Sequence, residues 1–346
     1  MKPTPHRIVI VGGGAGGLPL ATQLGHRMGR KGLAQITLVD AARTHVWKPL
    51  LHQLAAGTFD THAEEIEYLA QARWHHFRFR IGRMSGIDRV QRLVQLDATV
   101  DERGAEIAPP QQLPYDTLVI CVGSLTHDFG TPGAAEHSIK LDTPAAARQF
   151  NERLVNACLR AHSLPGDAPG AKWSVVIVGG GATGVELAAE LHSAARVLSS
   201  FGVEHVNPQE DMRIVLIEAA PRLLSQLPER LGRAALRELR KLAIEVHTGE
   251  TVVGVTPHSV ITASGRSIAS TITVWAAGVK GDEVLSGLGG VGGAEPLEHN
   301  RLNQLLVNGN LQTSRDARIY ALGDCAACPQ GDGRWVPPRA QAAHQQ

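Results

Sequence analysis

Two glycine motifs of the form G-x-G-x-x-G are the most informative feature of this sequence: Gly12, Gly14 and Gly17, then Gly179, Gly181 and Gly184. Each follows a run of apolar, β-branched residues, IVIV at 8–11 and VVIV at 175–178. The first glycine makes a tight strand-to-helix turn, the second lets the backbone approach a pyrophosphate, and the third lets helix and strand pack closely. The helix N-terminus then favours the negative charge. Two such motifs predict two bound dinucleotides, an arrangement suited to passing electrons between them.

An acidic residue at the end of the next strand binds an adenosine ribose in this kind of site. Asp40 ends a strand predicted at 36–39, close to the usual spacing of about 20 residues from the motif. Glu218 ends a strand predicted at 213–217, at a longer spacing that an irregular insertion at 199–211 explains. The alternative for Glu218 is a surface acid at a strand end. A ribose-binding Glu218 would repel a 2′-phosphate, so NADH is expected rather than NADPH.

A third acidic residue, Asp324, follows Gly323 directly after an apolar strand at 319–322. An N-terminal glycine motif with a late Gly-Asp is the arrangement of flavoproteins that bind two dinucleotides, where this carboxylate bonds the flavin ribityl hydroxyls. A helix N-cap is the alternative role, and both can hold. Gly123, which closes a buried strand at 118–122, joins the same predicted site. FAD is therefore expected at the Gly12 loop and NAD(H) at the Gly179 loop.

Two parallel sheets covered by helices are needed to position these loops, so the predicted fold class is α/β with two Rossmann-like domains. A linker rich in Pro and Gly at 163–170 precedes the second strand–helix–strand unit. We expect an NADH-binding domain at 141–289, inserted into an FAD-binding domain made of 1–140 and 290–346.

Composition excludes several classes of protein. A net charge of +1 gives no global electrostatic case for nucleic acid binding. No stretch approaches the ~18 apolar residues of a transmembrane helix. Four cysteines do not form a secreted disulfide framework, and no metal site is expected from their spacing or that of the histidines. Cys325 and Cys328 are spaced like a redox pair, but a redox or metal role is the less favoured interpretation.

Taken together, several segments resemble type II NADH:quinone dehydrogenases, the single-subunit respiratory enzymes that do not pump protons. The segments are HVWKPLLH at 45–52, GGGATGVELAAE at 179–190, VWAAGV at 274–279, LQT at 311–313, YALGDCA at 320–326 and PPRAQAAHQ at 337–345. No single segment is specific to this family, but the order and spacing of all of them together make the resemblance strong. The resemblance implies that hydride passes from NADH to bound FAD and that two electrons then pass to a membrane quinone.

The resemblance also implies roles for individual residues. Lys48 would lie near the flavin, where a cation stabilises the reduced, anionic ring. Gly278 would let the nicotinamide stack closely, and Glu186 would face the nicotinamide and flavin region, with a first-turn helix acid as its equally weighted alternative. Gln341 and Gln345 lie on one helix face and would meet the flavin on its quinone side. Without the resemblance, two solvent-facing glutamines would be preferred.

Family members attach peripherally to the membrane through a C-terminal segment, so the resemblance implies the cytoplasmic face of the bacterial inner membrane, and a homodimer is compatible with it. The chain stops at Gln346, inside the expected helix, so we expect the membrane-anchoring segment to be absent and this piece to be soluble. A ferredoxin reductase, a sulfide:quinone oxidoreductase and a non-catalytic protein that signals through bound NADH and FAD are the alternatives.

Overall fold

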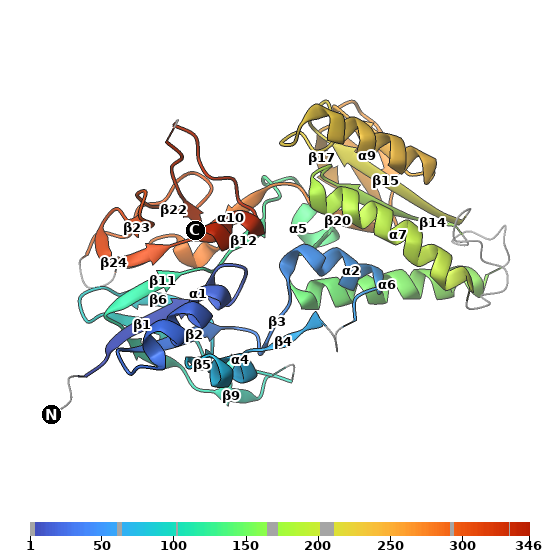
Figure 1. Ribbon diagram of the computed structural model, residues 1–346. Helices are drawn as coiled ribbons and strands as arrows, with labels where there is room; N and C mark the ends of the chain where they lie inside the picture. Colours follow the sequence, from blue (N-terminus) through green and yellow to red (C-terminus); the bar gives the residue numbers. More distant parts are fainter. Residues whose placement is uncertain are drawn as a thin grey trace. The chain divides into compact units, whose positions relative to one another are not determined.

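The chain forms two compact units, each built on a parallel sheet. The computed structural model describes residues 4–60, 64–101, 103–164, 172–200, 211–290, 294–331 and 333–346 (Figure 1). The first unit comprises Met1–Lys48, Glu64–Leu125 and Val279–Gln346, and the second comprises Pro49–Ala63 and Thr126–Gly278. The predicted α/β class with two Rossmann-like domains is confirmed. Within the described residues, no helix has the length and apolar character needed to cross a membrane.

The first unit has a six-stranded sheet in the order β23-β24-β11-β1-β2-β5. All neighbours run parallel except β23 and β24, which are antiparallel. The strands are β1 His6–Val11, β2 Ala34–Asp40, β5 Arg78–Ile81, β11 Thr117–Ile120, β23 Gln312–Thr313 and β24 Asp316–Ala321. Both predicted strands that carry the FAD site, at 8–11 and 36–39, are therefore present.

Side chains of β1 alternate between two hydrophobic cores, as the pleat of a strand requires. Ile8 and Ile10 pack with residues of α1 Gly17–Leu24 and α4 Tyr68–Trp74. Val9 and Val11 pack with residues of an antiparallel sheet of β6, β7 and β10. Its bounds are β6 Met84–Asp88, β7 Leu93–Leu96 and β10 Gln111–Pro114. Covering both faces explains why the strand is apolar throughout.

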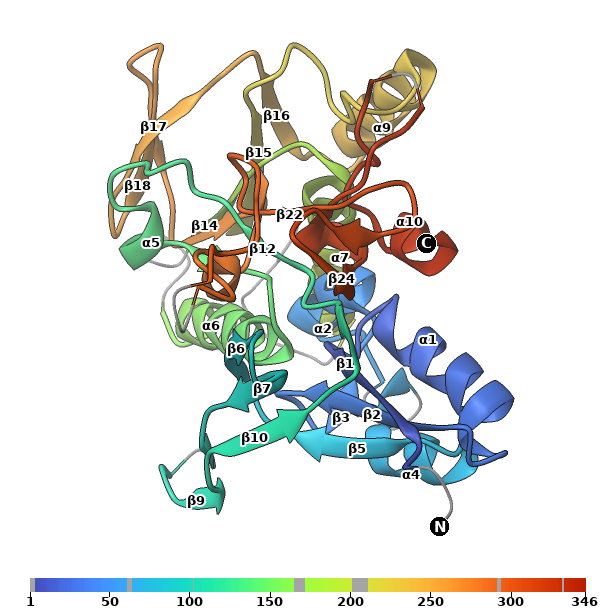
Figure 2. The same cartoon turned by 90° about the vertical axis from the view of Figure 1, so that its left-hand side faces the viewer.

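The second unit has a five-stranded parallel sheet in the order β13-β20-β14-β15-β16. Its strands are β13 Ile139–Lys140, β14 Trp173–Val178, β15 Met212–Glu218, β16 Glu245–Thr248 and β20 Ile272–Trp275. An antiparallel sheet of β17 Val252–Val255, β18 Ser259–Thr262 and β19 Ser267–Ala269 packs on one face through a shared core (Figure 2). The helices are α5 Ala134–His137, α6 Pro144–His162, α7 Ala182–Ser200 and α9 Glu229–Lys241.

Shorter elements complete the chain. Four two-stranded sheets pair β3 Thr44–His45 with β4 Ile66–Glu67, β8 Thr99–Val100 with β9 Glu106–Ala108, β12 Ser124–Thr126 with β21 Val279–Gly281, and β22 Leu305–Leu306 with β25 Ala326–Ala327. The remaining helices are α2 Leu51–Ala56, α10 Ala340–Gln345, a π-helix at Gly25–Gly29 and 3₁₀ turns at Lys48–Leu50, Glu283–Leu285 and Gly323–Cys325.

The boundaries of the units differ from the expected domains. The sequence places them at 140/141 and 289/290, whereas the chain divides at 125/126 and 278/279. Residues 49–63 also belong to the second unit because α2 packs against α6 and α7. The side-chain amide of Asn151 on α6 donates to the Ala55 carbonyl at 3.0 Å. The predicted linker at 163–170 and insertion at 199–211 lie mostly outside the described residues.

Candidate active site

The first glycine loop has the geometry that its motif requires. Gly12 has a φ of +100°, and a Cβ there would overlap the carbonyl group of Cys121 on the neighbouring chain segment. A Cβ on Gly17 would overlap the carbonyl oxygen of Gly12, so the helix starts as close to the strand as backbone allows. At Gly14, nothing lies within 4 Å of an added Cβ. The middle glycine therefore leaves a bare backbone surface open to a ligand.

The second glycine loop repeats this geometry. Gly179 has a φ of +117°, and a Cβ on it would overlap the backbone at Ala276. A Cβ on Gly184 would overlap the Gly179 carbonyl oxygen, and at Gly181 nothing lies within 4 Å. In both units, therefore, close packing requires the first and third glycines, and the middle glycine leaves the backbone open to a ligand. Backbone of this shape at a helix N-terminus fits a pyrophosphate.

Each loop is fixed by the acidic residue that the spacing singles out. The Asp40 carboxylate accepts hydrogen bonds from the backbone N–H of Gly13 at 2.6 Å and of Ala42 at 2.8 Å. Glu218 repeats the pattern, accepting from Gly180 at 2.5 Å and from Ala220 at 2.7 Å. Each carboxylate is thus held at the carboxyl end of its strand, where an adenosine ribose binds in this fold.

A tyrosine that no motif predicts covers the first loop. Tyr68 is 2% exposed, and its hydroxyl donates to the Gly13 carbonyl at 2.9 Å and lies 3.4 Å from an Asp40 oxygen. Burial, together with the Asp40 charge, raises the pKa of Tyr68. Burial also raises the pKa of Asp40, although the N–H groups of Ala42 and Gly13 oppose this shift. Tyr68 therefore acts as a neutral donor beside a buried carboxyl.

Three of the residues predicted for the flavin site meet around Ser124. The Ser124 hydroxyl donates to the Asp324 carboxylate at 2.8 Å, and the Lys48 ammonium donates to the Ser124 carbonyl at 2.7 Å. Gly123, with a φ of +73°, makes the turn into this residue. The Gln304 amide donates to the Asp324 carbonyl at 2.8 Å and holds the far side. Ser124 and Gln304 were not predicted as site residues, since neither lies in a spaced motif.

The C-terminal helix meets the flavin site through a different glutamine from the predicted ones. Gln341 and Gln345 on α10 are both exposed. Ala343 is buried against Gly323, and the side-chain oxygen of Gln346 accepts a hydrogen bond from the Gly323 N–H at 2.7 Å. The roles proposed for Gln341 and Gln345 stay predictions, and the observed contact is that of Gln346.

Comparison with known proteins decides the family. The chain matches the family described as pyridine nucleotide-disulphide oxidoreductase over residues 6–346. It is 42% identical to the type II NADH:quinone oxidoreductase of Haemophilus influenzae, over 98% of this chain and 77% of that protein. The Mycobacterium tuberculosis protein of the same name, NdhA, is 28% identical over 98% and 69%.

The chain belongs to the type II NADH:quinone oxidoreductases. A solved structure of NDH2 from Plasmodium falciparum in complex with NADH aligns with a TM-score of 0.79 at 20% identity, covering 93% of this chain and 64% of that one. A ferredoxin reductase from Rhodopseudomonas palustris aligns with a TM-score of 0.72 at 19% identity, covering 98% and 73%. These two likenesses confirm the fold. The predicted family is confirmed by the Haemophilus relative.

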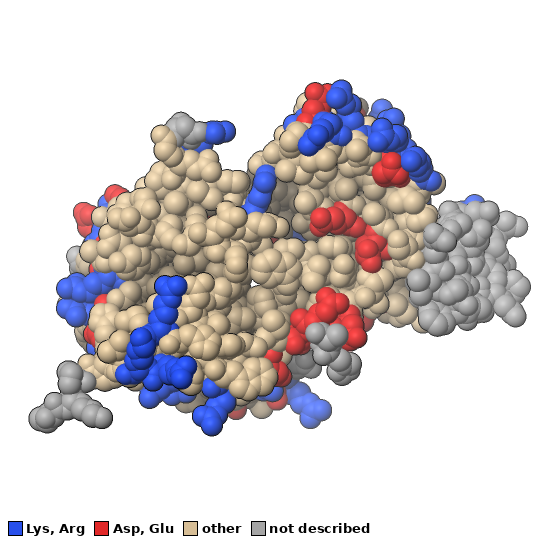
Figure 3. Space-filling view, in the orientation of Figure 1, with Lys and Arg blue, Asp and Glu red and all other residues tan. Residues whose placement is uncertain are grey.

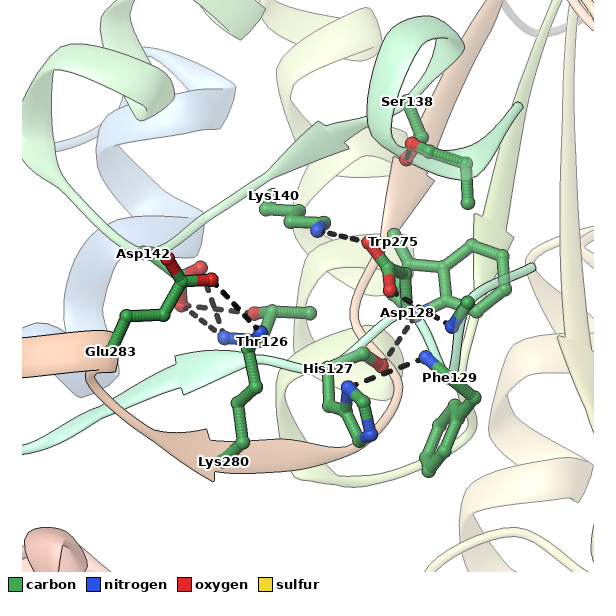
Figure 4. Close-up of polar contacts among 12 residues, drawn as sticks. Thr126, His127, Asp128, Phe129, Ser138, Lys140, Asp142, Trp275, Lys280 and Glu283 are labelled. Carbon is green, nitrogen blue, oxygen red and sulfur yellow. Dashed lines mark hydrogen bonds and ion pairs between the residues drawn. The ribbon is translucent and has the colours of Figure 1, made fainter. Parts of the chain in front are cut away.

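In this type II NADH:quinone oxidoreductase, side-chain contacts fix a loop at residues 126–129 of the second unit (Figure 4). His127 and Phe129 of this loop lie against Gly278. Both Asp142 oxygens accept from the Thr126 N–H at 3.0 Å, Lys140 pairs with Asp128 at 2.6 Å, and the Trp275 indole donates to the His127 carbonyl at 3.1 Å. The Lys140 hydrogen bond lowers the pKa of Asp128. Phe129, with a φ of +56°, is held over Gly278, where a Cβ would overlap its ring. Only glycine fits at position 278.

Glu186 lies in the first turns of α7, just after the second glycine loop. Its side chain is 52% exposed, and one carboxylate oxygen lies 3.7 Å from Nδ1 of His52 on α2. The sequence does not predict this neighbour, because residues 45–52 belong to the expected FAD-binding domain.

The four cysteines give this family member no disulfide in the described residues, despite the family description. All four are buried and free. Burial raises the pKa of the Cys325 thiol to about 12 and raises the pKa of Cys328 as well, so both favour the neutral form. Among the described residues, no group of three His, Cys, Asp or Glu side chains is placed to hold a metal ion.

The charged surface is mixed on the face shown in Figure 3. Lys and Arg gather over α9, but acidic residues lie among them: Arg233 pairs with Glu229 at 3.1 Å and Lys241 with Glu238 at 3.0 Å.

Proposed function

We propose that this chain transfers two electrons from NADH to a quinone without proton pumping, with FAD held at the Gly12 loop and NADH at the Gly179 loop. The observation that carries the proposal is the pair of matched glycine loops, each with an open middle glycine and an acid bound to its backbone. FAD, when bound, supplies the chemistry of accepting a hydride and giving up electrons to a second substrate.

In the first unit, this chain's residues bind and orient the flavin. The open backbone at Gly14 accepts the pyrophosphate, and Asp40 accepts ribose hydroxyls with the lone pairs that Gly13 and Ala42 leave free. Asp324, fixed by Ser124, takes the ribityl chain. Lys48 is fixed by the Ser124 carbonyl, which places a cation to stabilise reduced flavin.

In the second unit, the residues around Glu218 favour NADH over NADPH. A fixed carboxylate binds ribose hydroxyls and repels a 2′-phosphate. The nearest arginine in sequence is held by backbone carbonyls, which accept from three of its five N–H groups. The Arg222 guanidinium donates to the carbonyls of Leu224 at 3.1 Å, Ser225 at 2.6 Å and Leu227 at 2.9 Å.

Glu186, Gln341 and Gln345 are proposed to serve the quinone step. Glu186 is half-exposed on the helix that follows the NADH loop, and both glutamines are exposed on α10, so the side chain of each is accessible to a substrate. A peripheral position on the cytoplasmic face of the bacterial inner membrane, and a homodimer, complete the proposal. The peripheral position is what the resemblance to type II NADH:quinone dehydrogenases implies.

An anaerobic titration tests the proposed function. Addition of NADH to the flavin-loaded protein is expected to bleach the flavin absorbance at one equivalent, NADPH at equal concentration to bleach it far more slowly, and a soluble quinone to restore it. Bleaching by sulfide instead of NADH would favour a sulfide:quinone oxidoreductase. A long-lived charge-transfer band with no reoxidation by quinone would favour a non-catalytic NADH/FAD-binding protein.

A further inference from the structure

Reduction of a quinone by NADH consumes one proton that NADH does not supply. Oxidation of NADH to NAD⁺ releases a hydride, which is two electrons and one proton, whereas a quinone needs two electrons and two protons to become a quinol. One proton must therefore enter from solution in each turnover. We propose that His52 is a positioning residue that, through Glu186, holds this proton for the quinone step; the proposal rests on the function proposed above.

His52 is a buried base with an unused nitrogen. It lies on α2, its side chain is 9% exposed, and its Nδ1 has no hydrogen-bond partner among the described residues. This nitrogen lies 3.7 Å from Oε2 of Glu186. A buried nitrogen without a partner is unfavourable, so the placement is retained at a cost to stability. A small approach of the two side chains would let them share one proton, and imidazole exchanges protons near neutral pH.

The pair combines one exposed and one buried member. The Glu186 side chain is 52% exposed, so its carboxylate exchanges protons with water directly. His52 is shielded by its position on α2, which packs against both α6 and α7 (Figure 1). A proton taken up from water at Glu186 can therefore pass to a second base that is shielded from the solvent.

The same segment makes a second contact with α7, in which a neutral hydroxyl takes the place of the imidazole. One helical turn after Glu186, the Glu190 carboxylate accepts a hydrogen bond from the Thr58 hydroxyl at 2.6 Å. Two successive turns of α7 thus contact this segment. The first contact is made by the His52 imidazole and the second by the neutral hydroxyl of Thr58. Thr58 therefore provides a matched control for the structural effect of losing a contact.

The elements packed against α2 carry other titratable groups. On α7 these include Glu190, which accepts from Thr58, and the half-buried His192. On α6, Asn151 makes a hydrogen bond to α2, and Arg148, Glu152 and Arg153 are exposed. Thr58→Val disturbs the contact with α7 without removing a base, so a change in pH dependence that occurs only on replacing His52 is assigned to the pair with Glu186.

The test separates the two half-reactions in the flavin-loaded protein. Enzyme reduced anaerobically with one equivalent of NADH is mixed with a water-soluble benzoquinone from about pH 5.5 to pH 8.5, the range in which imidazole titrates. Flavin reoxidation is followed by absorbance. His52→Asn, which keeps a donor near the Nδ1 position but cannot titrate, is expected to slow reoxidation at least tenfold and to flatten its pH dependence. Loss of the proton donor itself would cost about 10²–10⁴-fold.

Two controls make the outcome decisive. Thr58→Val is expected to keep the wild-type rate and pH profile of reoxidation, and His52→Asn to keep the wild-type rate of flavin bleaching by NADH. A His52→Asn protein with wild-type reoxidation at every pH would overturn the proposal. His52→Gln replaces it where His52→Asn does not fold, with the same expectation. Failure of NADH to bleach the wild-type flavin would instead refute the proposed function, so the two failures are distinguishable.

Discussion

Two glycines in the NADH loop allow packing to be separated from ligand approach. A Cβ on Gly184 would overlap the carbonyl oxygen of Gly179, a backbone atom that cannot rotate away, so Gly184→Ala must push α7 off β14. Overpacking of this kind costs about 1–3 kcal/mol. Because a unit of this size loses roughly 2–4 °C in Tm per kcal/mol, we expect a drop of about 2–12 °C.

Gly181→Ala should behave in the opposite way. Nothing lies within 4 Å of a Cβ there, so stability should stay within about 0.5 kcal/mol of the wild type. The new methyl instead occupies the surface that the pyrophosphate approaches. We expect KM for NADH to rise at least tenfold, which corresponds to about 1.4 kcal/mol, while bound FAD is unchanged.

The assay is thermal unfolding of both variants beside steady-state NADH oxidation and the ratio of FAD to protein. An equal loss of Tm in Gly181→Ala and Gly184→Ala would refute the division of roles between the two glycines. So would a wild-type KM in Gly181→Ala.

Three other contacts in the structure can be tested by substitution. Glu218→Gln keeps an acceptor for the loop but removes the charge, so kcat/KM for NADPH relative to NADH should rise about tenfold in parallel assays. The Arg7 guanidinium donates to both Asp116 oxygens, and these hydrogen bonds lower the pKa of Asp116 in the folded protein. A lowered folded-state pKa stabilises the folded protein at pH values above the ordinary carboxyl range, and this stabilisation is lost as the pH falls. Arg7→Met should therefore lower the urea midpoint at pH 7, and the difference from wild type should narrow progressively as the pH falls below about 4. Tyr68→Phe removes the donor to a buried backbone carbonyl, so the apo protein should lose about 1–3 kcal/mol and FAD retention after desalting should fall; an unchanged FAD content would contradict a role for this hydroxyl in the flavin loop.

Local patterns predict the elements of this fold well, and tertiary packing explains what they miss. The apolar runs at 8–11 and 175–178 form β1 and β14 because a central parallel strand must be apolar on both faces. The helix predicted at 142–162 is α6, started by the Thr143 side chain, which accepts from the Ala146 N–H. Residues 49–63 fall in the second unit, unlike in the expected domains, because their partners, α6 and α7, are far away in the sequence.

The site divides in the same way. A glycine motif encodes backbone geometry, so both loops can be found from the sequence, Asp40 from its spacing and Glu218 from its place at the end of a strand. Ser124 and Tyr68 act through contacts with segments that are distant in the sequence, so no motif spacing predicts them. Gln346 makes the contact with Gly323 because it comes where the described helix α10 ends, one residue after the predicted Gln345.

The two loops share one backbone design but differ in what surrounds it, and this difference matches their proposed ligands. Beside Gly13, a buried tyrosine hydroxyl ties the loop to α4, and burial raises the pKa of the neighbouring Asp40. The corresponding place beside Gly180 is taken by the Leu223 side chain, which offers no hydrogen bond. A loop held rigid in advance loses less entropy when it binds and so retains its ligand longer. Tight retention suits a flavin that stays through every turnover, whereas NADH must leave as NAD⁺ each time. With FAD at the first loop and NADH at the second, as proposed, one loop design serves two pyrophosphates, and the neighbouring side chains favour a resident ligand in the first site and an exchangeable one in the second.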